Sequence, residues 1–173
     1  MFEFRVTKYN PAYRRQGAYT RDDWTSVSDI GRAFDGVVLT KAEYKRVENA
    51  YVASTVAFLR EAGVRFLTVV GLENHEKRPL PFSEDSVLDA TEAADVVRRM
   101  LRNEFWCRLE GADSFIHVGY DYYMYVGVPV NCPHSVAMAR QIGLFVEPFR
   151  SPYGTQAEPC GEREPPTTRD QKS

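Results

Sequence analysis

A chain of 173 residues that is 43% hydrophobic and 27% charged has the composition of a globular protein, and it can bury a core without disulfides or metal. The formal net charge of −2 excludes a general attraction to nucleic acid or anionic lipid. No apolar run approaches the roughly 20 residues of a membrane-spanning helix, and the first residues lack the apolar segment of a secretory signal. The three cysteines, an odd number, indicate reduced thiols, so we expect a cytoplasmic protein.

The first predicted element is a strand at residues 2–9, where apolar and polar side chains alternate. Residues 10–36 show no sustained period and contain Asn-Pro and several glycines. We interpret them as a long loop with one helical turn at 28–32. Trp24 indicates that this loop packs onto the rest of the molecule.

The clearest helix is predicted at residues 40–63. Thr40 and Glu43 form a capping-box pattern, and apolar side chains follow at spacings of three and four. The β-branched and nearly all apolar segment 64–73 is typical of a central strand that is covered on both faces.

A second helix is predicted at residues 89–103, after a loop at 74–87. It also begins with a capping-box pattern, Asp89 with Glu92. Asp95 and Arg99 lie four residues apart on its polar side, which favours an ion pair between them. We interpret the basic residues of this helix as one solvated face; they are Arg98, Arg99 and Arg102.

Three short strands with tight turns are predicted next, at 104–110, 114–120 and 122–128, and they indicate an antiparallel meander. Pro133 is well placed in the first turn of a helix at 133–142. A last strand is predicted at 144–149.

These elements predict an α+β fold within residues 1–150. We expect a single mixed, mostly antiparallel sheet of five or six strands, with about three helices packed mainly on one face. Residues 151–173 are rich in proline and charge and poor in large apolar groups, so we expect a disordered tail there.

The most unusual stretch is GYDYYMYVGV at 119–128, because it concentrates tyrosines in one strand. Alternation places Tyr123 and Tyr125 on one face and Tyr122 on the other. If one face lies open, its rings form an aromatic platform for a partner protein or a nucleic-acid base. The plainer interpretation is that tyrosine favours strands and that these rings are packed. The candidate binding residues are Tyr120, Asp121, Tyr123, Tyr125 and Trp24.

Metal binding has weak candidates in Cys107, His117, Cys132 and His134, because zinc accepts cysteine and histidine. No Cys-x-x-Cys pair accompanies them, and a strand cysteine is more often a small core residue. We therefore expect no metal, and we expect no cofactor because no dinucleotide, phosphate-loop or metalloprotease motif occurs.

Catalysis has weak candidates in Cys107 and His117, which lie on adjacent predicted strands, with Glu110 as a third group. No nucleophile motif accompanies them. The polar segment at 73–76, with His75, ends a strand where α/β proteins often bind ligands, although it also has the composition of an ordinary loop.

The sequence favours a non-enzymatic, cytoplasmic protein-binding domain, similar in kind to immunity proteins that neutralise a toxin or to regulatory adaptors. We expect a protein partner, no membrane association and no nucleic acid, because the tyrosine stretch contains no lysine or arginine. The alternatives are a small hydrolase or transferase that uses Cys107 and His117, and a single-strand RNA binder that uses Tyr123 and Tyr125. The oligomeric state is left open.

Overall fold

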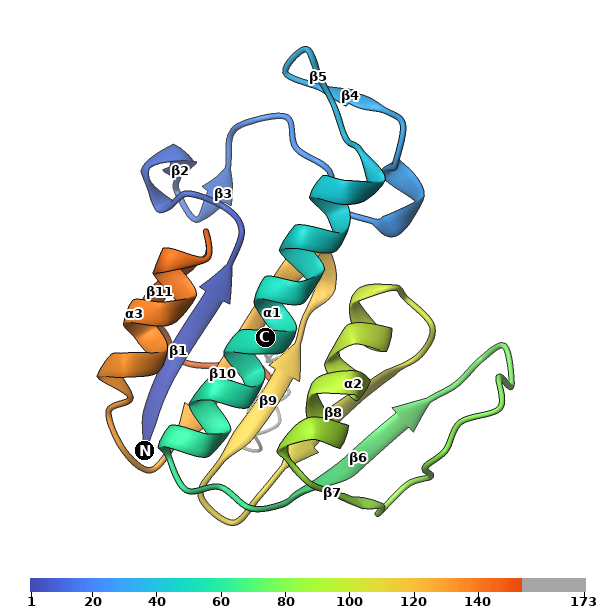
Figure 1. Cartoon of the computed structure of the whole chain (residues 1–173), viewed down its shortest axis with the longest axis vertical. Helices are drawn as coiled ribbons and strands as arrows, with labels where there is room; N and C mark the ends of the chain where they lie inside the picture. The colour runs from blue at the N-terminus through green and yellow to red at the C-terminus, as the bar shows by residue number, and fades with distance from the viewer. Residues whose placement is uncertain (154–173) are drawn as a thin grey trace, which may run out of the picture.

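One antiparallel sheet of seven strands forms the frame of the molecule (Figure 1). A computed structural model describes residues 1–153, with the side chain of Tyr120 left out. Every neighbouring pair of strands is antiparallel, so the α+β class is confirmed and no parallel pair is present among the described residues. Across the sheet the order is β11 (Phe145–Pro148), β1 (Phe2–Thr7), β10 (Tyr123–Val128), β9 (Phe115–Val118), β8 (Trp106–Glu110), β6 (Leu67–Glu73) and β7 (Val87–Leu88).

Three helices lie side by side in front of the sheet, with α1 (Lys41–Glu61) between α2 (Ala90–Leu101) and α3 (Pro133–Gln141) (Figure 1). At the start of α2 the predicted capping box of Asp89 and Glu92 is complete. Thr40 caps α1, but the reciprocal half is absent because the Glu43 carboxylate binds Arg46 instead.

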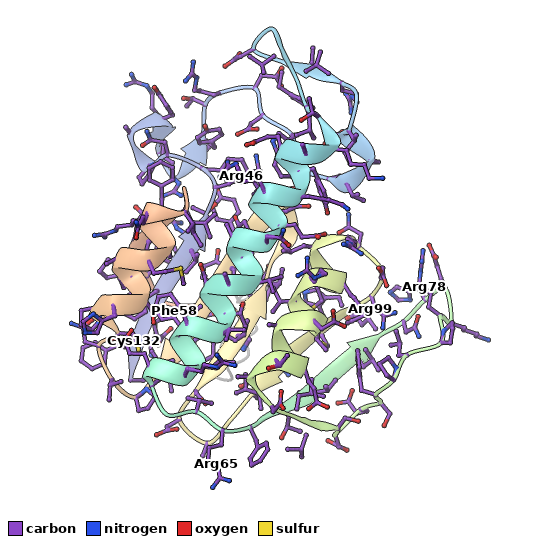
Figure 2. All side chains as sticks on the ribbon, viewed as in Figure 1. Arg46, Phe58, Arg65, Arg78, Arg99 and Cys132 are labelled. Carbon is purple, nitrogen blue, oxygen red and sulfur yellow. The ribbon has the colours of Figure 1, made fainter. Side chains whose placement is uncertain are left out.

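The core lies between the helices and the sheet. Alternate side chains of each strand point into it, as the period of two predicts, and Met124 and Ile116 are fully buried there. From α1, Phe58 lies beside Cys132 at the start of α3; both are labelled in Figure 2. We call the opposite face of the sheet, turned away from the helices, its outer face.

A buried carboxylate joins the first two helices, which the sequence did not predict. Glu48 of α1 is fully buried and binds both Arg98 of α2 and Arg102, the residue directly after α2, with nitrogen–oxygen distances of 2.9 and 2.6 Å. Arg99 binds Glu104 at 2.7 Å rather than Asp95. The interpretation of the α2 arginines as one solvated face, neutralised by Asp95, was therefore wrong.

The segment between β1 and α1 contains two small hairpins that the sequence did not reveal. They project at the upper end of the molecule in Figure 1. Each turns through a glycine in the left-handed region, Gly17 in the first hairpin and Gly36 in the second. The strands are β2 (Arg14–Arg15) with β3 (Ala18–Tyr19) and β4 (Ala33–Phe34) with β5 (Val37–Val38). Two 3-10 turns, Pro11–Tyr13 and Val27–Asp29, complete the segment.

The strand β6 lies next to the edge of the sheet, not at its centre. Its buried residues alternate with half-exposed ones, so only the helix side is fully covered. The edge strand β7 consists of Val87, the last residue of the loop expected at 74–87, and Leu88, which follows it. Within residues 1–153 no helix has the length and apolar character needed to cross a membrane.

Candidate functional site

The outer face of β10 carries Tyr123 and Tyr125, as the alternation predicts. The structure does not leave this row of rings open, however. Tyr125 is only 8% exposed, because the rings of Phe149 and Tyr153 lie 5.9 Å from its ring. Tyr123 is half-buried and packs against Tyr9 at 5.3 Å. The expected aromatic platform is thus largely covered by the chain itself.

Charged side chains fill the space beside these rings. Glu147 of β11 forms ion pairs with both Arg5 and Arg14, whose side chains are nearly buried. The Arg5 guanidinium also lies 3.9 Å from the centre of the Phe149 ring, a favourable cation–π contact. This network holds the N-terminal loop at Arg14 and the Phe149 ring, which follows β11, against the outer face.

The remaining candidate binding residues do not form one surface. Trp24 is 7% exposed and lies on the helix side of the sheet, with its ring 4.8 Å from the ring of Tyr122. Asp121 is exposed at the turn between β9 and β10, where it adopts a left-handed conformation. The side chain of Tyr120 lies outside the described part of the structure. Trp24 is therefore a core residue, because helix α1 and the turn enclose it.

His117 on β9 forms the most elaborate polar contact of the outer face. Its Nδ1 lies 2.8 Å from the Ser151 hydroxyl, and its Nε2 lies 3.0 Å from a Glu110 carboxylate oxygen. The imidazole stacks on Phe115 at 4.2 Å, and its side chain is 1% exposed. Burial lowers the pKa of His117 below the usual histidine value, and the hydrogen bond to Glu110 opposes this shift only in part.

A serine, a histidine and a carboxylate in a row is the arrangement of a serine hydrolase. A hydrolase also has both histidine nitrogens hydrogen-bonded, but here His117 is 1% exposed and Ser151 is 9% exposed, so the serine hydroxyl is not open to a substrate. The Ser151 hydroxyl also accepts a hydrogen bond from the Tyr153 backbone N–H at 3.2 Å. The Ser151 N–H donates to Glu3 at 2.8 Å. The group therefore fastens residues 149–153 to the sheet. Sequence reasoning had expected the tail to begin at residue 151 and did not include Ser151.

Cys107 and His117 are not brought together. In the ladder between β8 and β9 the residue opposite His117 is Arg108, so Cys107 points to the other face. Its sulfur lies 3.8 Å from that of Met100 of α2. Burial raises the pKa of the Cys107 thiol to about 12, which keeps it protonated and unreactive at neutral pH. The proposed nucleophile pair was wrong because alternation places the two side chains on opposite faces.

The four weak metal candidates are also spread over the molecule. Cys132 is buried against α1, His134 is exposed at the start of α3, and the other two lie on opposite faces of the sheet. Burial raises the pKa of Cys132 to about 11. Within residues 1–153 no group of three or more histidine, cysteine or acidic side chains is arranged to hold a metal ion.

A surface that sequence reasoning did not select lies at the other end of the sheet. We call residues 79–96, which run from the loop after β6 through β7 into α2, the acidic corner. A pocket of about 230 Å³ opens there. Pro81, Phe82, Leu88 and Val96 form its apolar part, and Thr91, Glu92 and Asp95 complete its lining. Nearby on the edge strand, Val87 is 61% exposed.

The charge of the acidic corner is one-sided. Residues 84–95 contain five carboxylates and no lysine or arginine. None of the five forms an ion pair with any residue in the range 1–153, since the arginines of α2 are engaged by Glu48 and Glu104. Glu84 instead accepts hydrogen bonds from the backbone of Gly71 and Leu72, both at 2.7 Å. An apolar pocket with unpaired negative charge around it is suited to a cationic partner.

A second hollow, of about 210 Å³, adjoins the end of β6. The polar segment singled out in the sequence contributes Glu73, His75 and Glu76 to its wall, opposite Glu104 and Trp106. His75 lies 3.5 Å from Glu73 and is highly exposed. Glu76 pairs with Arg78 and Glu104 pairs with Arg99, so the acids of this wall are mostly paired within the chain, and the hollow shows no assembled catalytic group.

Comparison with protein-family models, with curated proteins and with solved structures finds no match for the chain. We therefore infer function from the chemistry of the described residues.

Proposed function

We propose that this chain is a non-enzymatic protein-binding domain that acts in the cytoplasm and that engages a basic partner protein through the acidic corner. Such a domain would neutralise or regulate its partner, as immunity proteins and adaptors do. The observation that carries the proposal is a run of five carboxylates that form no ion pair within residues 1–153, two of which, Glu92 and Asp95, line an apolar pocket.

Unpaired charge and exposed apolar area together support an interface. Backbone N–H groups stabilise three of the five carboxylates, but the side chains of Asp85 and Asp95 form no hydrogen bond or ion pair with a described residue. Like charges that cluster without counter-ions repel one another, and a partner that supplies cations relieves this repulsion. Val87 exposes most of its side chain on an edge strand, where an apolar residue also costs solvation. A partner that covers this surface relieves the charge repulsion and buries the Val87 side chain. Complementary charge on the partner also speeds association.

The contacts on the outer face favour binding over catalysis. The one serine–histidine–carboxylate row that we find in residues 1–153 is covered by the chain itself, because His117 and Ser151 are both buried. The covered rings of β10 also move the proposed interface away from the tyrosine stretch.

The test is a quantitative pull-down from the native lysate, with two matched charge variants. The first is Glu92→Gln with Asp95→Asn, and the second is Asp22→Asn with Asp113→Asn. Asp22 and Asp113 are also exposed and form no ion pair within residues 1–153. Each variant removes two charges without changing side-chain size.

The expected result is a stoichiometric partner that the wild type and the Asp22/Asp113 variant recover and that the Glu92/Asp95 variant loses. Binding should also weaken between about 50 and 300 mM salt, because exposed charges are screened within roughly 10 Å at 0.1 M. Recovery of the same partner by both variants, or of no stoichiometric partner at all, would refute the proposal.

A further inference from the structure

We propose that the pocket of the acidic corner is an anchor site for one arginine or lysine side chain of the partner. This inference rests on the proposed function and gives it a specific contact. The pocket lies between the loop before β7 and the first half of α2.

The apolar part of the pocket suits the stem of a long basic side chain. Pro81, Phe82 and Leu88 line it, and lysine and arginine bury their methylene groups along such surfaces while the charged head stays at the rim. Phe82 is held in place by an edge-on contact with Phe105, at 5.3 Å between ring centres. A fixed aromatic ring also favours a cation by a cation–π interaction.

The rim supplies acceptors that the chain does not use. Asp95 forms no hydrogen bond or ion pair with another described residue, because Arg99, one turn further along α2, binds Glu104 instead. Glu92 uses one carboxylate oxygen to cap the helix and has the other free. The two residues are three apart on α2, so their side chains lie on the same side of the helix, next to each other.

This combination selects among ligand classes. A purely aliphatic side chain would fill the apolar part and leave the carboxylates unpaired, and an anion would be repelled by them. A guanidinium or ammonium group on an aliphatic stem satisfies both parts of the pocket at once. Arginine adds planar, bidentate hydrogen bonding to carboxylates.

The experiment uses the full chain, labelled with ¹⁵N, and titrates it with Nα-acetyl-arginine amide while amide chemical shifts are recorded. Nα-acetyl-citrulline amide is the matched probe, with nearly the same shape and no charge. We expect shifts confined to the pocket and binding at least about tenfold weaker for citrulline, since a hydrogen bond between charged groups exceeds a neutral one by about that factor.

Two variants separate the parts of the pocket. Thr91→Leu fills the pocket from its exposed lining without changing charge, and Ala53→Leu on α1 is its control at another exposed helical position. Thr91→Leu should abolish the arginine shifts, and Ala53→Leu should leave them unchanged. Equal response to arginine and citrulline, or shifts outside the pocket, would overturn the anchor. So would self-association that Asp95→Asn abolishes, since a second copy would then occupy the site.

Failure of the anchor and failure of the proposed function give different results. If the partner is lost with the Glu92/Asp95 variant but retained by Thr91→Leu, the acidic corner binds without a pocketed side chain and only the anchor is refuted. If neither variant changes partner recovery, the proposed function itself fails.

Discussion

The tyrosine strand β10 and the acidic corner differ in how far the chain itself covers and pairs their side chains. The strand and the turn before it contain the richest run of aromatic residues, and their rings are packed: Tyr122 of the turn toward the helices and Tyr125 of the strand on the outer face. The acidic corner consists of a loop, a two-residue strand and a helix start, yet it holds unpaired charges and exposed apolar area. Aromatic abundance therefore indicates where a core forms, and charges without an ion-pair partner mark the surface where we propose that a partner binds.

The two regions should respond to mutation in opposite ways. Changes in the tyrosine strand should cost stability, because the chain already uses those contacts. Changes in the acidic corner should cost binding and leave stability nearly intact. Three expected outcomes test this contrast, and they are taken from the largest effect on stability to the smallest.

The largest effect is expected for Tyr122→Ala. The Tyr122 ring packs against Trp24, and its hydroxyl donates to the Leu101 carbonyl and lies within hydrogen-bonding distance of Tyr44, at 3.0 Å for both contacts. Loss of such a buried ring costs about 3–5 kcal/mol of unfolding free energy. The matched variant, Tyr123→Ala, removes a half-buried ring and should cost about 1 kcal/mol.

Urea denaturation of both variants measures the difference. Tyr122→Phe is the control, because it keeps the ring in the same left-handed backbone conformation and loses only the hydroxyl contacts. Similar losses for Tyr122→Ala and Tyr123→Ala would contradict the view that the strand is packed mainly against the helices.

Strong local patterns made most of this fold predictable. The capping box at Asp89, the stripe of α1 and the alternation of β10 each depend on neighbouring residues, and each is found as expected. The small hairpins were missed because a strand of two residues has no period to detect. The seventh strand, β7, was missed for the same reason.

The candidate sites were less predictable because they depend on contacts between distant segments. Glu48 meets Arg98 and Arg102 from 50 and 54 positions away, and Ser151 meets His117 from 34. Alternation correctly assigned the faces of β10, but it gave no information about which segment covers each face. Asp95 likewise has no ion-pair partner among the described residues because Arg99 binds Glu104, which the spacing of Asp95 and Arg99 did not reveal.

The next effect is a pH dependence caused by His117. Burial lowers its pKa in the folded state below the value of about 6.5 that it has when unfolded, so the unfolded chain binds more protons in that range. The neutral histidine therefore contributes its full stability above about pH 6.5, and this contribution is lost as pH falls through the folded pKa. Glu110 and Glu3 nearby favour the proton, and Arg108 and burial oppose it.

Denaturation curves at pH 7.5 and pH 5.5 measure this effect for the wild type and for His117→Gln, which retains hydrogen-bonding groups toward Ser151 and Glu110. The wild type should lose more stability than the variant over this interval. An equal loss in both proteins would show that His117 does not titrate in this interval as its burial requires.

The smallest effect on stability is expected for Asp95→Asn in the acidic corner. Its carboxylate has no partner within the described chain, and its neighbours in sequence include four further acids that form no ion pair with a described residue. Removal of the charge relieves repulsion and breaks no contact, so the free energy of unfolding should change by less than about 0.5 kcal/mol and should not fall. The same variant should bind acetyl-arginine amide at least about tenfold more weakly. A stable variant that no longer binds would separate the two regions completely, whereas a clear loss of stability would mean that Asp95 belongs to the fold, as the tyrosines of β10 do.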